Sequence, residues 1–436
     1  MLKLKAPISI QVELTEFCNH NCTHCYNYWR SDTSWQKEAE KIDGQKLLDI
    51  ADKIIEAEVL HVVLTGGEPF VVPLSTLDSV VKKYRDNGIS VSINSNITLL
   101  RPEHIGFLKK YQLGVLTSII SCNEKEFDDV TLKPGSFKKF CNNLEELSKQ
   151  NIYVSANMVV DKTRINQVYD TGKLVASLGV KGFCGTRMSP SNNGVLNDYA
   201  TRILDTNDMP VLFDQLLAVE RDFGLTVSSL NSIPFCCVDN PEKYSNLLTR
   251  SCNAGQTGAG MSANGDLRLC QHFDINTGNV LQTPLKELWD LMPSWKQEYI
   301  STSSCNSCVE NQRCGGGCRE NAYKIDNNLF GEDSLKRMPL KQRITEKYLD
   351  NVDSIQFNSG VKCREEDFGA ILFRGSGAYA IVDGFTHAIA KNLYSRPVIT
   401  AKDILEIGSE LSFVNNNYVN RMFNNLVRNK VARVYR

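Results

Sequence analysis

The alternation of strand-like and helix-like segments in the first half of the chain most constrains its fold. Six short apolar runs rich in β-branched residues cover residues 8–14, 60–65, 89–95, 113–120, 153–160 and 180–187. Amphipathic helical patterns lie between them at 44–57, 75–85, 135–150 and 166–178. Strands separated by helices predict a parallel sheet with right-handed crossovers. Six such units predict an α/β fold, a partial (β/α)6 barrel of the TIM type with its chemistry at the carboxyl ends of the strands.

Charge and cysteine content narrow the chemistry. The formal net charge of −1 gives no reason to expect nucleic acid or an anionic membrane as a partner. We see no signal peptide and no apolar run near the ~18 residues of a membrane span, so we expect a cytoplasmic protein. In a reducing compartment, spaced cysteines indicate metal binding rather than disulfides. Nine of the fifteen cysteines fall into two spaced groups.

The first cysteine group directly follows the first predicted strand. Cys18, Cys22 and Cys25 have the spacing CxxxCxxC. Three thiolates on one loop can bind three irons of a [4Fe–4S] cluster, which leaves the fourth iron open for a substrate or cofactor. A zinc site that uses His20 or His24 as its fourth ligand is the alternative.

This motif resembles that of the radical S-adenosylmethionine (radical SAM) superfamily. Gly66-Gly67-Glu68 after the second predicted strand resembles the GGE motif, which implies contact with the SAM amino group. Asn94-Ser95-Asn96 lies where relatives often read Thr-Asn-Gly and contact the ribose, and the chain departs from that pattern. The resemblance implies an oxidoreductase in which a reduced [4Fe–4S] cluster cleaves SAM to a 5′-deoxyadenosyl radical, with flavodoxin or ferredoxin as electron donor.

The same resemblance implies a set of cofactor contacts at the strand ends. For Ser118, Asn157 and Arg187 a plain structural role is the alternative. The implied contacts are Tyr26, Gly66, Gly67, Glu68, Asn94, Asn96, Ser118, Asn157 and Arg187.

The second cysteine group resembles the SPASM domain, an auxiliary iron–sulfur module of peptide-modifying radical SAM enzymes. Its motif is Cys252-x12-Gly265-x4-Cys270, followed by Cys305-x2-Cys308-x5-Cys314-x3-Cys318. The resemblance implies one auxiliary cluster on Cys252, Cys270 and Cys318, with Cys236 favoured over Cys237 as the fourth ligand. It implies a second cluster on Cys305, Cys308 and Cys314.

The sequence does not determine the fourth ligand of that second cluster. Relatives usually carry a cysteine where this chain has Lys336. Asp333 as an oxygen ligand, Cys363 folding back, and an incomplete cluster are the alternatives. A zinc ribbon is the alternative reading of the whole group.

The last segment has a different pattern. Apolar runs at 368–373 and 378–382 flank a Gly-containing turn and predict a hairpin. Helical patterns at 384–393, 401–408 and 416–429 and a strand at 431–435 complete a winged-helix-like α+β module. It resembles the small peptide-binding domain of ribosomal peptide maturases, and dimerisation, a structural cap or DNA binding are the alternatives. The predicted domains are thus 1–225, 226–345 and 353–436.

These observations predict a radical SAM enzyme of RiPP biosynthesis, which matures a ribosomally made precursor peptide. We expect the leader to bind the C-terminal module by strand addition. A thioether cross-link is favoured, with a carbon–carbon link or decarboxylation as alternatives. Two rival functions are a maturase of a folded protein, as in sulfatase-activating relatives, and a non-catalytic iron–sulfur scaffold or sensor. The catalytic acid or base and the oligomeric state are not assigned.

Overall fold

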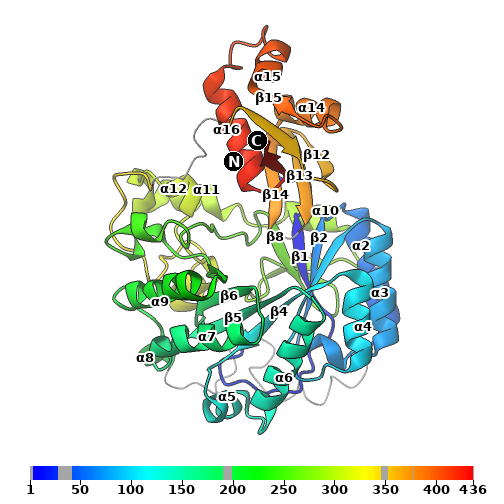
Figure 1. Cartoon of the computed structure of the whole chain (residues 1–436), viewed down its shortest axis with the longest axis vertical. Coiled ribbons are helices and arrows are strands. Elements are labelled where there is room, and N and C mark those ends of the chain that lie inside the picture. The colour runs from blue at the N-terminus through cyan, green and yellow to red at the C-terminus, as the bar shows by residue number, and fades with distance from the viewer. Residues whose placement is uncertain (1–2, 28–41, 190–198, 345–351, 376, 436) are drawn as a thin grey trace. The chain divides into compact units, whose positions relative to one another are not determined.

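The computed structural model describes residues 3–27, 42–189, 199–344, 352–375 and 377–435 (Figure 1). The chain divides into two compact units. The large unit is Ala6–Thr345, and the small unit combines Met1–Lys5 with Glu346–Arg436.

A ten-stranded sheet forms the centre of the large unit, in the order β10-β9-β8-β1-β2-β3-β4-β5-β6-β7. Strands β1 to β7 run parallel to their neighbours, and β8 pairs parallel with β1. The strands are β1 (Ser9–Glu13), β2 (His61–Thr65), β3 (Ser90–Asn94), β4 (Gly114–Ile119), β5 (Val154–Val160), β6 (Gly182–Arg187), β7 (Thr226–Ser228), β8 (Gly258–Met261), β9 (Asp266–Arg268) and β10 (Asn276–Asn279). Because β10 and β7 are its edges, the described sheet is open, and the predicted large parallel α/β sheet is confirmed.

Amphipathic helices connect the parallel strands. In α2 (Gly44–Glu56) the buried residues Leu47, Ile50, Ala51 and Ile54 follow the spacing of one helix face. Asp43 caps this helix by accepting a hydrogen bond from the Lys46 amide. The other helices of this part are α3 (Leu74–Asp86), α4 (Pro102–Tyr111), α5 (Glu124–Thr131), α6 (Ser136–Lys149), α7 (Val168–Ser177), α8 (Tyr199–Arg202) and α9 (Asp208–Phe223). No helix within the described ranges is long and apolar enough to cross a membrane.

The cysteine-rich segment 226–345 shares the sheet and the core of the barrel segment. Its aromatic residues Phe235, Phe273, Trp295 and Tyr299 are fully buried in the common hydrophobic cluster. Because β8 pairs with β1, the predicted boundary at 225/226 does not separate two compact units. Its helices are α10 (Leu285–Asp290), α11 (Trp295–Thr302), α12 (Asn311–Cys314) and α13 (Arg319–Asp326).

The small unit contains two three-stranded antiparallel sheets. Their orders are β15-β11-β16 and β12-β13-β14. The predicted hairpin is present as β13 and β14, and β12 pairs with β13, so β12 and β14 are the edge strands. The elements are β11 (Ser354–Phe357), β12 (Lys362–Glu366), β13 (Gly369–Gly375), β14 (Ala378–Asp383), α14 (Gly384–Leu393), β15 (Ile399–Thr400), α15 (Ala401–Ile407), α16 (Asn416–Arg428) and β16 (Ala432–Val434).

Candidate functional site

The first cysteine loop lies at the carboxyl end of β1 and is fixed from two sides. The amides of Asn21 and Thr23 donate to the carbonyls of Thr131 and Val130, each over 3.0 Å. The Asn96 side-chain amide lies 3.9 Å from the Cys18 sulfur. Cys18, Cys22 and Cys25 are half-buried and unoxidised. His20, the alternative zinc ligand, instead has its Nε2 3.1 Å from Thr98 Oγ1.

Gly66 and Gly67 allow this loop to pass directly against the end of β2. A Cβ atom on Gly67 would lie 2.0 Å from the carbonyl oxygen of Phe17, and one on Gly66 would lie 2.4 Å from that of Thr15. Gly66 also has a φ of 126°, which disfavours any side chain. The Gly67 amide donates to the Thr15 carbonyl over 2.7 Å. Both glycines are therefore required by the position of the cysteine loop.

Glu68 organises the segment after β3. Its carboxylate is 1% exposed and accepts hydrogen bonds from Ser95 Oγ (2.7 Å), the Asn96 amide (2.8 Å) and the Phe70 amide (3.0 Å). Burial raises the pKa of Glu68 to about 7, although these three donors oppose the shift. Glu68 thus connects the predicted GGE motif to Asn96, and through Asn96 to the cysteine loop.

The other predicted cofactor contacts lie on neighbouring strands. Asn94 ends β3, and Ser118 on β4 pairs in register with Asn157 on β5. Ser118 is exposed, whereas the Asn157 side chain accepts a hydrogen bond from Thr186 over 2.5 Å. The Tyr26 ring stacks on His272 with 4.0 Å between ring centroids. This stack joins the first cysteine loop to the segment after Cys270.

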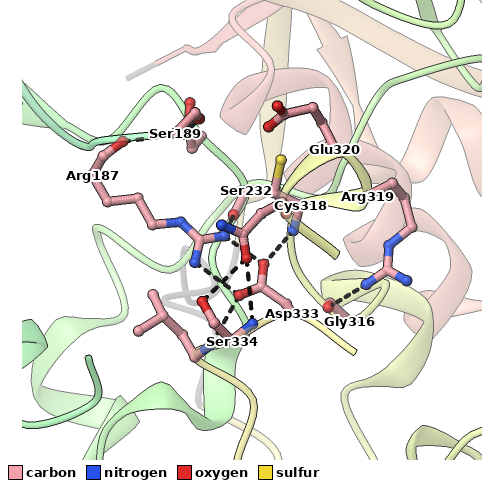
Figure 2. Close-up of polar contacts among 12 residues, drawn as sticks. Arg187, Ser189, Ser232, Gly316, Cys318, Arg319, Glu320, Asp333 and Ser334 are labelled. Atoms are coloured by element: carbon pink, nitrogen blue, oxygen red, sulfur yellow. Dashed lines mark hydrogen bonds and ion pairs between the residues drawn. The ribbon is translucent and has the colours of Figure 1, made fainter. Parts of the chain in front are cut away.

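Arg187 makes a buried ion pair with Asp333 across the two halves of the large unit (Figure 2). Its Nη1 lies 2.8 Å from Asp333 Oδ1, and its Nη2 also donates to the Ser232 carbonyl over 3.3 Å. The Asp333 carboxylate further accepts from the amides of Cys318 (2.7 Å) and Leu335 (3.0 Å). Burial opposes the charge of Arg187, but Asp333 outweighs it and raises the guanidinium pKa.

These contacts concern one of the alternative ligands of the second auxiliary cluster. Asp333 was an alternative for the second auxiliary cluster, but its carboxylate accepts four hydrogen bonds from Arg187, Cys318 and Leu335. Cys363 was another alternative. It lies exposed on β12 of the small unit, opposite Leu372.

Cys252, Cys270 and Cys318 form one thiol group in the large unit. Burial, and then the Cys252 thiol, raise the pKa of Cys270 to about 12. The same two causes raise the pKa of Cys318 well above its usual value. Thiols in such a site need a bound cation to become thiolates. Within the described ranges, no three Cys, His, Asp or Glu side chains converge closely enough to hold a single metal ion.

Cys305, Cys308 and Cys314 form the second group, and Cys236 lies with them. These four cysteines line one cavity of about 340 Å³ of atom-free space, part of which is open to solvent. Burial raises the pKa of Cys314 to about 12. Cys236 was predicted to join Cys252, Cys270 and Cys318, whereas the structure places it beside Cys305, Cys308 and Cys314. Cys237 is not among the residues that line this cavity and is fully buried in the core.

Sequence reasoning missed one polar residue beside the first thiol group. Glu320, on α13 two residues after Cys318, is 2% exposed. Its Oε2 accepts no hydrogen bond from the described residues, and His272 Nδ1 lies 3.9 Å away. Burial raises the pKa of Glu320 to about 8. Cysteine spacing carries no signal for this carboxylate, because only the packing of α13 turns it inward.

Comparisons with known proteins agree with this geometry. Residues 12–171 match the radical SAM superfamily. The antilisterial bacteriocin subtilosin biosynthesis protein AlbA of Bacillus subtilis is 24% identical over 74% of this chain and 70% of its own length. An AdoMet-dependent heme synthase of Methanosarcina barkeri is 21% identical over 75% of this chain and 95% of its own length.

A solved structure shares the fold. The crystal structure of Streptococcus suis SuiB bound to precursor peptide SuiA is similar with a TM-score of 0.59. The two chains are 17% identical, and the match covers 76% of each.

Replacing Gly67 by alanine should prevent the first cysteine loop from closing. The added Cβ would meet the Phe17 carbonyl at 2.0 Å, so the loop that carries Cys18 must move. We expect anaerobically reconstituted Gly67→Ala to bind about four fewer irons per chain. Gly106→Ala is the matched control, because its Cβ would meet no atom within 4 Å. Equal iron in Gly67→Ala and the unmodified protein would contradict this role.

Removing the charge of Asp333 should destabilise the large unit. Asp333→Asn leaves the buried Arg187 guanidinium without its counter-charge, which costs about 3–5 kcal/mol for buried pairs. The free energy of unfolding, measured by urea denaturation, checks this. The control is Asp239→Asn, because Asp239 is 96% exposed in its ion pair with Arg337. That change should cost about 0–1 kcal/mol. Equal losses in both variants would refute the role of the buried pair.

Proposed function

Because residues 12–171 match the radical SAM superfamily, we propose that this chain is a peptide maturase. It cleaves SAM and installs a cross-link in a ribosomally made precursor peptide. The observation that supports SAM cleavage is the packing of the Cys18–Cys25 loop on Gly66, Gly67 and Asn96. Members of this superfamily use a [4Fe–4S] cluster and SAM, and three cysteines on one fixed loop fit such a cluster.

The residues around the loop have distinct proposed roles. Cys18, Cys22 and Cys25 would hold three irons of a [4Fe–4S] cluster, which when bound and reduced would supply the electron for reductive cleavage of SAM. Gly66 and Gly67 let the loop approach β2 closely. Glu68 is a positioning residue, because its carboxylate holds Ser95 and Asn96. Tyr26, Asn94, Ser118 and Asn157 remain proposed SAM contacts.

Arg187 keeps only an indirect part in this proposal. Its guanidinium binds Asp333 and the Ser232 carbonyl. We therefore assign Arg187 the role of holding the carboxyl end of β6 against the segment that follows Cys318. These contacts favour a structural role for Arg187 over a direct contact with SAM.

The two auxiliary thiol groups support an oxidative cross-link. Forming a thioether from a C–H and an S–H group removes two hydrogens from the peptide. One leaves as a hydrogen atom that converts the 5′-deoxyadenosyl radical to 5′-deoxyadenosine. The other leaves as a proton to solvent and an electron. We assign the auxiliary clusters as the acceptors of that electron, and a flavodoxin or ferredoxin as the donor of the first one. The alternatives to the thioether are a carbon–carbon link and a decarboxylation.

The substrate class rests on the relatives and on the small unit. AlbA is named for biosynthesis of a bacteriocin, and SuiB was solved with a precursor peptide. The edge strands β12 and β14 offer backbone groups to which an extended leader can add as a strand. The match to the heme synthase covers 75% of this chain and 95% of the relative's length.

Changing Cys18, Cys22 and Cys25 together to alanine should abolish SAM cleavage. The auxiliary thiols lie on other segments, so we expect about eight irons per chain to remain after reconstitution. The measurements are 5′-deoxyadenosine by liquid chromatography and iron by colorimetry. Cys122→Ala with Cys141→Ala removes thiols outside both groups and should leave both values unchanged. Retained 5′-deoxyadenosine in the triple variant would exclude the assigned cluster loop.

Deleting residues 353–436 should uncouple SAM cleavage from peptide modification. A leader bound elsewhere on the chain raises the local concentration of the attached core peptide, by about 10²–10⁴-fold in comparable tethered systems. We expect the deletion to keep SAM cleavage and to lose peptide modification by a similar factor, measured by mass spectrometry. The full-length enzyme with a leaderless peptide should show the same loss. Unchanged peptide turnover by the truncated enzyme would rule out recruitment by this unit.

A further inference from the structure

We propose that Cys236 is the fourth ligand of the second auxiliary cluster, together with Cys305, Cys308 and Cys314. This inference rests on the auxiliary clusters of the proposed function and is independent of the substrate. The four cysteines come from three short segments, because Cys236 lies on the one-turn helix Phe235–Cys237, nearly seventy residues before Cys305. They line a single cavity. Four thiolates around one cavity are the ligand set of a [4Fe–4S] cluster.

Backbone amides already point at two of these sulfurs. The Arg337 amide lies 3.3 Å from Cys236 Sγ, and the Phe235 amide lies 3.3 Å from Cys314 Sγ. Amide hydrogen bonds to cluster sulfurs stabilise the anionic thiolate and tune its potential. The sulfurs of Cys236 and Cys314 therefore each face a backbone amide donor. A buried thiol that served only to fill the core would not need a donor aimed at its sulfur.

Lys336 also lines this cavity. It stands where relatives usually carry the fourth cysteine, so the fourth ligand must come from another, upstream position. Its ammonium group binds Ser304 and Glu332, so its side chain is fixed and nearly buried. An ammonium cannot ligate iron, since it has no lone pair, but it favours a nearby anionic cluster. The Asp333 carboxylate is paired with Arg187. Among the described cysteines, Cys236 is the one that lines the cavity in addition to Cys305, Cys308 and Cys314.

The adjacent Cys237 provides a matched control. Its side chain lies in the hydrophobic core and does not line the cavity. Both variants are built on the full-length parent that carries alanine at Cys18, Cys22 and Cys25, so that only auxiliary iron remains. After anaerobic reconstitution with iron and sulfide, iron is quantified and the EPR spectra of oxidised and reduced protein are recorded. No peptide and no turnover are needed.

We expect Cys236→Ala to lose about four irons per chain or to convert one cluster to a three-iron form with its own EPR signal. Cys237→Ala should keep the iron and the spectra of the parent. Cys236→Ser, which offers an oxygen ligand, should restore the iron and shift the midpoint potential. Parent-like iron and spectra in Cys236→Ala would overturn the assignment, as would a loss of iron confined to Cys237→Ala. A parent without auxiliary iron would overturn both this ligand set and the auxiliary clusters of the proposed function.

Discussion

The buried ion pair between Arg187 and Asp333 is the interaction on which the arrangement of the candidate sites depends. It joins the carboxyl end of β6 to the segment that follows the last cysteine of the second motif. The Asp333 carboxylate also accepts from the amide of Cys318, so the same contact fixes a proposed cluster ligand. Two charges in a dry interior are favourable only when each is fully paired, which makes this junction rigid and sensitive to change.

Around that ion pair, the three thiol groups are attached to one continuous sheet and hydrophobic core. The cysteine-rich segment adds β8 to the barrel sheet beside β1, the strand that leads into the first cysteine loop. Glu13 at the end of β1 forms a buried ion pair with Arg268 over 2.7 Å, and the Tyr26–His272 stack adds an aromatic contact nearby. Radical chemistry needs a fixed distance between the SAM site and any electron acceptor. A shared sheet and core provide that constraint better than a flexible linker would.

The fold of the large unit could be predicted from sequence because its signals are local. All six apolar runs are strands in the structure. The same holds for a local signal in the small unit, where the helix at 384–393 has the predicted bounds. Periodicity alone could not show that β8 adds to the barrel sheet, since that pairing joins residues about 250 positions apart. Nor could spacing place Cys236, because its partners in the cavity are distant in sequence. Contacts such as Arg187–Asp333 and the inward position of Glu320 depend on packing, for which a single sequence carries no pattern.

The function proposed for the Cys18–Cys25 loop is to support reductive cleavage of SAM. The most direct measurement is the yield of 5′-deoxyadenosine after anaerobic reconstitution with iron and sulfide, followed by SAM and dithionite. We expect about eight to twelve irons per chain, as two or three clusters, and 5′-deoxyadenosine that requires both SAM and reductant. A fully iron-loaded protein that forms no 5′-deoxyadenosine, with or without candidate peptides, would contradict it and favour a non-catalytic iron–sulfur scaffold.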